Sequence, residues 1–181
     1  HDGLLNDDAP GEITLRAMDA GAAMRIGSRW LVMTTDSHVV QPLFFPGGDI
    51  GRLAVSGTVN DLSMMGATDV FAMTCAVIIE EGFSRADLER IQRSIRRTCE
   101  EAGARIVTGD TKVMGKGELD GIVINTTGVA LTDRVIPDFI PESELQKDKG
   151  LPGKLAEQNT RFRNENFKVE QLPFYVIVSP N

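Results

Sequence analysis

Cysteine is scarce in this sequence: Cys75 and Cys99 are the only two among 181 residues. Two cysteines at this separation provide neither the disulfide framework of a small secreted domain nor the paired spacing of a zinc site. Long apolar runs are missing too, because no uninterrupted stretch approaches the roughly 18–20 residues that a membrane-spanning helix needs. The N-terminus also lacks the pattern of a signal peptide. We therefore expect a soluble, cytoplasmic protein that does not enter a membrane.

A surplus of basic residues is also missing. The sequence has 19 Lys and Arg against 26 Asp and Glu, which gives a formal net charge of −7. Proteins that bind nucleic acid through its phosphates usually carry a basic surplus, so this composition argues against nucleic acid as a partner. What the sequence does have is apolar material, since 41% of its residues are hydrophobic. That fraction is typical of a globular protein and too high for a disordered one.

The composition changes near residue 137. All seven Met and all but two of the 18 Gly precede Asp138, and Pro137 stands at the change. Such a shift often marks a domain boundary. We interpret residues 1–137 as the main domain and residues 138–181 as an unassigned tail. Within this tail, residues 174–178 (Phe-Tyr-Val-Ile-Val) are typical of a strand.

The residue pattern of the main domain predicts strands that alternate with helices. Asp49 and Ser84 stand where helix N-caps are favoured, and Gly66 and Gly103 stand where helices often end. Strands are expected at residues 30–36, 70–79, 105–108 and 122–131. This order predicts an α+β protein with a mixed sheet and its helices packed on one face. Cys99 falls on the apolar side of the second helix, where we expect it to belong to the core.

Acidic residues stand at or near the ends of several predicted elements. They are Asp36 in TTDS, Asp61 in VNDL and Asp110 in GDTK, and Asp19 in MDAGAA is a fourth. Carboxylate oxygens are ligands that Mg²⁺ prefers, and Mg²⁺ often joins one or two carboxylates to substrate phosphates. Lys112, two residues after Asp110, can meet a phosphate as a point charge. Taken singly, each Asp can equally be a cap or turn residue, and both interpretations stay open at this point.

Two further features carry weaker signals. Residues 46–51 (PGGDIG) are glycine-rich and open a predicted helix, where backbone N–H groups can bind an anion. The segment matches neither common nucleotide-binding glycine motif, and an ordinary loop capped by Asp49 explains it as well. His38 is the only internal histidine, and a structural role is the simpler interpretation for it. No Ser-His-Asp or Cys-His triad can be assembled from the sequence.

In this order, the segments TTDSHVVQPLFFPGGDIG, VNDL, GDTK and INTTGVAL together resemble the HypE family of hydrogenase maturation factors. The resemblance extends from Met18 to Asp133. The HypE family belongs to an ATP-binding superfamily with aminoimidazole ribonucleotide synthetase, selenophosphate synthetase and thiamine-monophosphate kinase. The resemblance implies an N-terminal ATP-binding domain of the aminoimidazole ribonucleotide synthetase type, whose strands join a barrel across a homodimer.

The resemblance also implies an activity. Members of this family dehydrate a carbamoyl group on their own C-terminal cysteine to a thiocyanate, in a reaction that uses ATP. The product supplies the cyanide ligand of the iron in nickel–iron hydrogenase. The implied cofactors are ATP and Mg²⁺, and the implied partners are a carbamoyltransferase of the HypF type and other hydrogenase maturation proteins.

Matching positions imply roles for individual residues. The metal-binding carboxylates correspond to Asp19, Asp36, Asp61 and Asp110. The residues implied to contact ATP are Asp36, Asp61, Gly109, Asp110, Thr111 and Lys112. Lys112 is the implied catalytic residue at the phosphates, and His38, which lies inside the matching segment, is a second candidate.

The sequence departs from the family pattern in three respects. Ala20 stands where the family has a second adjacent acid, the second domain of the family has no counterpart, and the chain ends Ser-Pro-Asn without a cysteine. We therefore expect this chain to be the ATP- and Mg²⁺-binding, dimerising part, which does not complete the reaction by itself. Two alternatives stay open, namely a non-catalytic dimerisation or partner-docking module and, less favoured, a small-molecule kinase of the same superfamily.

Overall fold

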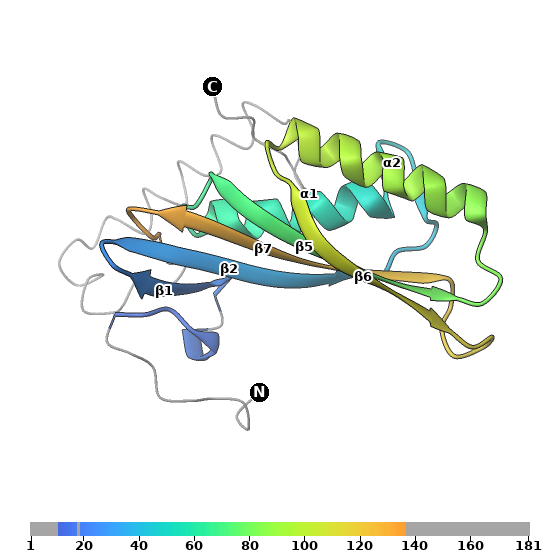
Figure 1. The fold of residues 1–181 in the computed structure, drawn as a ribbon, viewed down its shortest axis with the longest axis horizontal. Helices are drawn as coiled ribbons and strands as arrows, with labels where there is room; N and C mark the ends of the chain where they lie inside the picture. The colour runs from blue at the N-terminus through green and yellow to red at the C-terminus, as the bar shows by residue number, and fades with distance from the viewer. Residues whose placement is uncertain (1–10, 18, 137–181) are drawn as a thin grey trace. The chain divides into compact units, whose positions relative to one another are not determined.

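The computed structural model describes residues 11–17 and 19–136, which include nearly the whole predicted main domain (Figure 1). The predictions for residues 138–181, including the strand at 174–178, lie outside the described residues. None of the helices in the described part has the length and apolar character that a bilayer crossing requires.

A five-stranded mixed sheet forms the body of the described structure. Its strand order is β1–β2–β7–β5–β6, in which β5 and β6 are parallel and all other neighbours are antiparallel. The strands are β1 (Ala22–Ile26), β2 (Arg29–His38), β5 (Val70–Glu80), β6 (Ile106–Met114) and β7 (Ile122–Thr132). The sequence analysis did not anticipate β1, nor the short ladder of β3 (Phe44–Phe45) and β4 (Gly48–Asp49).

Two helices begin and end where the capping residues predicted. In α1 (Ile50–Met64), the Asp49 carboxylate accepts hydrogen bonds from the first backbone N–H groups. In α2 (Arg85–Glu101), the Ser84 hydroxyl accepts a hydrogen bond from the Asp87 N–H. Shortly after each helix the chain turns at a glycine of positive φ, Gly66 at +79° and Gly103 at +64°. This conformation favours glycine, which explains why both helices end there. A 3₁₀ turn, η2 (Leu15–Ala17), precedes β1.

Both helices lie on the same face of the sheet, as predicted (Figure 1). α1 packs on β2 and β7, and α2 packs beside α1. The two helices approach closely because Gly51 has no side chain: a Cβ there would lie 2.7 Å from the Ile91 carbonyl oxygen. The apolar core fills the space between the helices and the sheet, and its fully buried large side chains include Ile50, Leu62, Met65, Met73, Ile91, Ile122 and Ile124.

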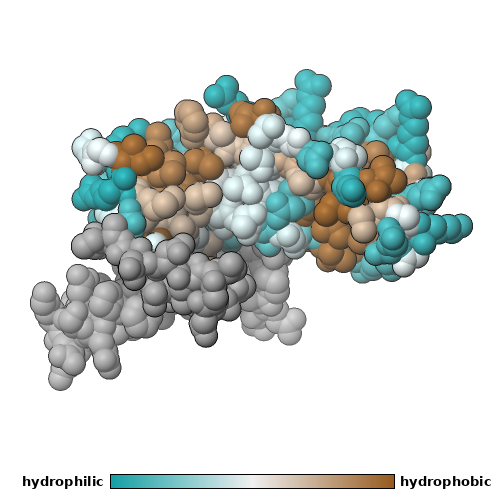
Figure 2. Space-filling view, turned by 60° about the horizontal axis from the view of Figure 1, so that its bottom comes forward, coloured by the Kyte–Doolittle hydropathy of each residue, from teal (hydrophilic) through white to brown (hydrophobic). Residues whose placement is uncertain are grey.

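The opposite face of the sheet carries neither α1 nor α2, and we call it the helix-free face. Alternate residues of a strand point to opposite faces. In β2, Thr34 and His38 are buried on the helix side, whereas Thr35 and Ser37 are exposed on the helix-free face. Figure 2 shows pale and hydrophilic residues in the middle of this view, between two hydrophobic areas.

Strand β6 differs from its prediction. A short strand at 105–108 was expected to lead into GDTK, but β6 runs through this motif to Met114. It is an edge strand whose residues are exposed along almost its whole length, so it shows no hydrophobic alternation by which the sequence could reveal it. Its register shifts at Val107: Met73 pairs with Ile106, and the next residue, Thr74, pairs with Thr108. This bulge decides on which face the GDTK side chains lie.

Candidate functional site

Polar side chains gather where β2 faces α1. Thr34, Asp36 and His38 alternate along β2 on the helix side, and α1 presents Gly57 and Asp61 to them. A Cβ on Gly57 would lie 2.8 Å from His38 Cε1 and 3.1 Å from Asp36 Oδ2. One turn further along α1, the Asp61 carboxylate lies 3.2 Å from the Thr34 hydroxyl. We call these five residues the β2–α1 seam.

His38 and Asp36 form a close pair within the seam. His38 Nε2 lies 3.3 Å from Asp36 Oδ2, and the histidine side chain is 4% exposed whereas the Asp36 side chain is 37% exposed. This contact is not a hydrogen bond, and the buried Nε2 has no hydrogen-bond partner among the described residues. Burial lowers the pKa of His38, and the Asp36 carboxylate opposes this by raising it. The neutral imidazole is therefore favoured behind a carboxylate that solvent can reach.

Helix α1 is fixed over the sheet by a buried pair of hydroxyl groups. The hydroxyls of Thr58 and Thr126 lie 2.6 Å apart, and Thr126 also donates to the Ala54 carbonyl oxygen at 2.9 Å. Gly128 on β7 leaves room for this contact, because a Cβ there would lie 2.7 Å from Thr58 Cγ2. These contacts determine how α1 sits on β7, and hence where Asp61 stands opposite β2.

Asp19 lies beside the same seam. Its carboxylate accepts a hydrogen bond from the Ala20 N–H at 2.8 Å, and the Ala20 carbonyl oxygen lies 2.9 Å from the Thr34 hydroxyl. The structure thus brings Asp36 and Asp61 to one seam and places Asp19 next to it. Within the described ranges, however, no three His, Cys, Asp or Glu side chains are arranged to hold a metal ion together.

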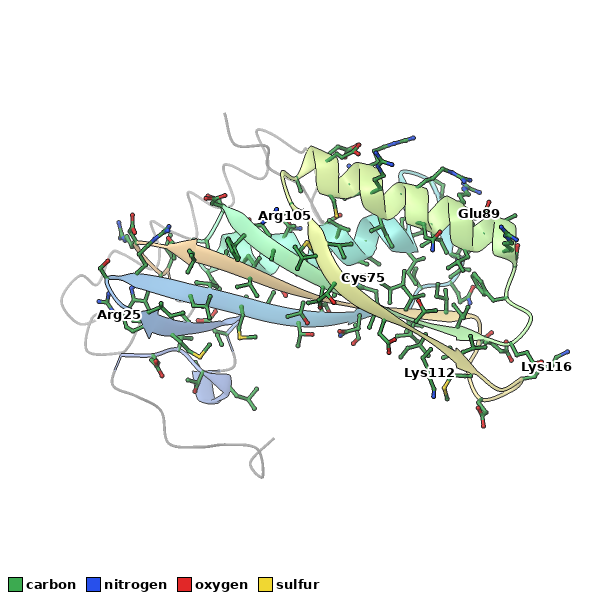
Figure 3. All side chains as sticks on the ribbon, in the orientation of Figure 1. Arg25, Cys75, Glu89, Arg105, Lys112 and Lys116 are labelled. Atoms are coloured by element: carbon green, nitrogen blue, oxygen red, sulfur yellow. The ribbon has the colours of Figure 1, made fainter. Side chains whose placement is uncertain are left out.

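The GDTK residues lie elsewhere on the molecule. Asp110 pairs with Ala76, which pairs with Asn125, which in turn pairs with Ser37, so these residues form one row across the helix-free face. Lys112 lies two residues further along β6 on the same face, and Figure 3 shows it pointing away from the helices. Asp36 points to the opposite face, with β7 and β5 between its strand and β6. A single chain does not bring Asp110 and Lys112 to the seam.

The other two GDTK positions face the helix side of β6. Gly109 pairs with the buried Cys75, and a Cβ at Gly109 would collide with the Cys75 carbonyl group. Thr111 pairs with Val77 and is exposed. Gly109 therefore allows β6 to pair closely with β5, and this packing explains the glycine without a ligand.

The glycine-rich PGGDIG segment is capped by its own aspartate. Asp49 Oδ1 accepts hydrogen bonds from the N–H groups of Gly51 at 2.8 Å and Arg52 at 3.0 Å. The backbone donors that an anion would use at the start of α1 are thus occupied by a carboxylate. The structure supports the interpretation of this segment as a capped loop.

Both cysteines lie in the core. Burial raises the pKa of Cys75, and burial together with the neighbouring Cys75 and Glu100 raises the pKa of Cys99 to about 11. Thiols of this kind stay protonated at neutral pH and are poor nucleophiles. Neither is suited to carry a transferable group.

Sequence reasoning missed two residues of this region. Thr34 joins the Ala20 segment to Asp61, and Asn125 binds the backbone of β2 from the helix-free face. Asn125 lies in INTTGVAL, one of the segments that carried the family resemblance without a role for any of its residues. Thr34 opens TTDSHVVQPLFFPGGDIG, another segment that carried the resemblance, but it was given no role because a threonine in a strand is ordinary.

Comparisons with known proteins agree with this fold. The family described as AIR synthase related protein, N-terminal domain, matches residues 18–132. Carbamoyl dehydratase HypE of Cupriavidus necator is 54% identical over 112 residues, which are 62% of this chain and 31% of that protein. The chain spans about a third of the length of the curated relatives it matches.

Solved structures of HypE proteins are also similar to this chain in sequence and fold. A HypE–HypF complex contains a chain that is 52% identical with a TM-score of 0.60, over 65% of this chain and 37% of that one. HypE in complex with ATP is 47% identical with a TM-score of 0.55, over 71% of this chain and 34% of that one. The resemblance to HypE is thereby confirmed, and the chain belongs to the family of AIR synthase related proteins, whose N-terminal domain it contains.

Proposed function

We propose that this chain is the ATP- and Mg²⁺-binding, dimerising part of a cytoplasmic carbamoyl dehydratase of the HypE type. The observation that carries the proposal is the β2–α1 seam, which brings Asp36 and Asp61 together in a chain whose relatives include carbamoyl dehydratases. The HypE relative with bound ATP supports the nucleotide, and the relative in complex with HypF supports a carbamoyltransferase of that type as a partner.

The chemistry of the seam fits Mg²⁺ bound together with phosphates. Mg²⁺ prefers oxygen ligands and is commonly held by one or two carboxylates plus the substrate's own phosphates. Asp36 is partly exposed and Asp61 faces the same seam, so this pair offers what such an ion needs from the protein. The bound ion would neutralise charge on the transferring phosphoryl group.

A second copy of the chain would bring the GDTK residues to the nucleotide. Asp110 and Lys112 lie on the face of the sheet opposite to Asp36, so a site that uses all three needs two chains. Two observations support association at this edge. Among the described strands, β6 lies at the edge of the sheet, and its Val107 and Val113 are 54% and 57% exposed. Unpaired strand edges with exposed apolar residues readily pair with another strand.

In the proposed reaction the chain's residues handle charge and alignment. The γ-phosphoryl group of ATP moves to the carbamoyl oxygen, which later leaves as phosphate while the nitrogen gives up two protons and the carbon–nitrogen triple bond forms. The cation of Lys112 would stabilise the charge on the transferring phosphoryl group. Cys75 and Cys99 are buried thiols, so the carbamoyl group has to be supplied on another cysteine.

Titration calorimetry with Mg-ATP tests the nucleotide claim. We expect the unmodified chain to bind, and Asp36→Asn and Asp61→Asn to bind at least about tenfold more weakly, because each loses a charged ligand oxygen. Asp133→Asn is the matched control: it also removes one carboxylate, but Asp133 is exposed and pairs with Arg29. An unmodified chain that fails to bind, or seam variants that bind as tightly as the control, would refute the proposal.

Mixed chains test the shared site. Asp61→Asn and Asp110→Asn chains should each bind Mg-ATP poorly alone. After they are unfolded and refolded together, about a quarter of all sites should regain normal affinity, since a symmetric dimer of unlike chains then holds one intact site. Each variant refolded with itself is the control. If mixing restores nothing while the chains form dimers, Asp61 and Asp110 do not share a site across the interface.

A dimerisation or docking module without nucleotide is the second candidate. It is favoured by Ala20, which stands where the family has an acid next to Asp19. Sedimentation and thermal unfolding distinguish the two functions. A dimer whose mass and melting temperature do not respond to Mg-ATP, with no heat of binding, would support this second candidate.

A further inference from the structure

The INTTG segment of β7 reaches both faces of the sheet. Thr126 and Gly128 point to the helix side and fix α1, as described above. Asn125 and Thr127 point to the helix-free face, where they meet residues 35–37 of β2. The helix-side residues have a packing role, which leaves the role of Asn125 to be explained.

The side-chain amide of Asn125 is directed at the strand that carries Asp36. Its Nδ2 lies 2.9 Å from Ser37 Oγ, 3.0 Å from the Asp36 carbonyl oxygen and 3.3 Å from Thr35 Oγ1. A backbone carbonyl oxygen only accepts hydrogen bonds, so the NH₂ group and not the oxygen of the amide must face it. The two N–H bonds of the amide are used by the two shorter contacts.

This contact fixes Asp36 from the side opposite to its carboxylate. The Asp36 side chain lies on the helix side, against Gly57 and His38. Its backbone carbonyl receives the Asn125 bond in addition to the pairing of Asp36 with Thr126 in the β2–β7 ladder. Asp36 is therefore held by α1 on one face and by Asn125 on the other. A shift of the β2 backbone at this point moves the carboxylate directly.

We propose that Asn125 is a positioning residue that holds Asp36 in the orientation needed to bind Mg-ATP. The inference rests on the proposed function, in which Asp36 is a ligand of the nucleotide-bound ion. Asn125 acts through the backbone of Asp36 and touches neither the ion nor the nucleotide. Groups that orient a metal-binding side chain commonly affect metal affinity about tenfold or more when they are removed.

Two variants and one control test this role in the chain of 181 residues. Asn125→Ala removes the amide, and Asn125→Asp keeps its shape but replaces the NH₂ donor with an oxygen that only accepts. Thr127→Val is the control: it lies two residues away on the same strand and face, and its hydroxyl bonds Thr35, 3.0 Å away, instead of Asp36. Calorimetry should show Mg-ATP affinity reduced about tenfold in both Asn125 variants. The control should stay within about twofold, since it keeps the Asp36 bond.

A second measurement reports on the backbone without any nucleotide. Hydrogen exchange of the peptide that spans residues 34–38 should be faster in Asn125→Ala than in the unmodified chain, and unchanged in Thr127→Val. Three results would overturn this inference while leaving the proposed function in place. They are a folded Asn125→Ala chain whose 34–38 peptide exchanges as slowly as in the unmodified chain, one that binds Mg-ATP as tightly as the unmodified chain, and a Thr127→Val chain that loses as much affinity as Asn125→Ala. An unmodified chain that does not bind Mg-ATP would overturn the proposed function, and this inference with it.

Discussion

Replacing Gly57 with alanine should destabilise the protein, although the same change usually stabilises a helix. In an unobstructed helix interior, Gly→Ala gains about 0.5–1 kcal/mol, because glycine loses more backbone entropy on folding. Here the added Cβ would lie 2.8 Å from Cε1 of the buried His38 ring and 3.1 Å from Asp36 Oδ2. Forcing a methyl group into a packed interior costs about 1–3 kcal/mol. We therefore expect a net loss of about 1–2 kcal/mol in the free energy of unfolding.

Urea unfolding measures this change as a lower midpoint at constant slope. In a thermal scan the same loss corresponds to a melting temperature about 2–8 °C lower, at about 2–4 °C per kcal/mol for a chain of this size.

The His38→Ala background shows whether the imidazole causes the loss. With the ring removed, Cε1 no longer obstructs the new methyl group, so Gly57→Ala should become neutral or stabilising there. Two results would refute the reasoning: a Gly57→Ala variant that is more stable than the unmodified chain, or a destabilisation that is equal in both backgrounds.

Three further changes have expected outcomes. Thr126→Val should lower the free energy of unfolding by about 1–3 kcal/mol, because it leaves the buried Thr58 hydroxyl without its partner. Urea unfolding measures this loss, and Thr127→Val, which should lose less stability, is the control. Asp49→Ala removes the N-cap of α1 and should lower the free energy of unfolding by about 1 kcal/mol in the same assay. Asp49→Ser should lose less stability, because a serine hydroxyl can also cap the helix. Cys99, whose pKa is raised to about 11, should react with a thiol reagent at pH 8 far more slowly in the native chain than in urea. In the unfolded chain the Cys99 thiol has its ordinary pKa of 9.0. Its contribution to the stability of the folded state is therefore complete below pH 9.0 and is lost as the pH rises toward 11. Urea unfolding at pH 8 and pH 10, with and without Cys99→Ala, measures this loss of stability.

The sequence predicted those parts of the fold that local chemistry determines. Asp49 and Ser84 cap helices because their side chains satisfy the free N–H groups at a helix start, and this needs no knowledge of the rest of the chain. The strand β7 was visible because apolar and β-branched residues make up most of it, and in the structure its burial alternates from Ile122 to Ala130. The edge strand β6 was recognised only at its beginning, since little of it is buried.

The grouping of the candidate site residues could not be predicted in the same way. The carboxylates lie far apart along the chain, and their positions in space depend on strand order and register. Asp61 meets β2 because α1 crosses it at Gly57, and nothing near Asp61 in the sequence encodes that crossing. Asp110 lies on the other face of the sheet because of its register with β5. The family resemblance named these residues together, whereas the structure separates them within one chain.

The register shift at Val107 has a consequence for how relatives of this protein are compared. Without this bulge, Thr74 would pair with Val107, and every later residue of β6 would exchange faces. Asp110 and Lys112 would then point to the helix side of the sheet, although the motif GDTK would read the same. The same residues paired without this bulge would therefore present these charges on the opposite face, while sequence identity hardly changes. A shared GDTK motif in this family therefore indicates a shared site only where the bulge before it is shared as well.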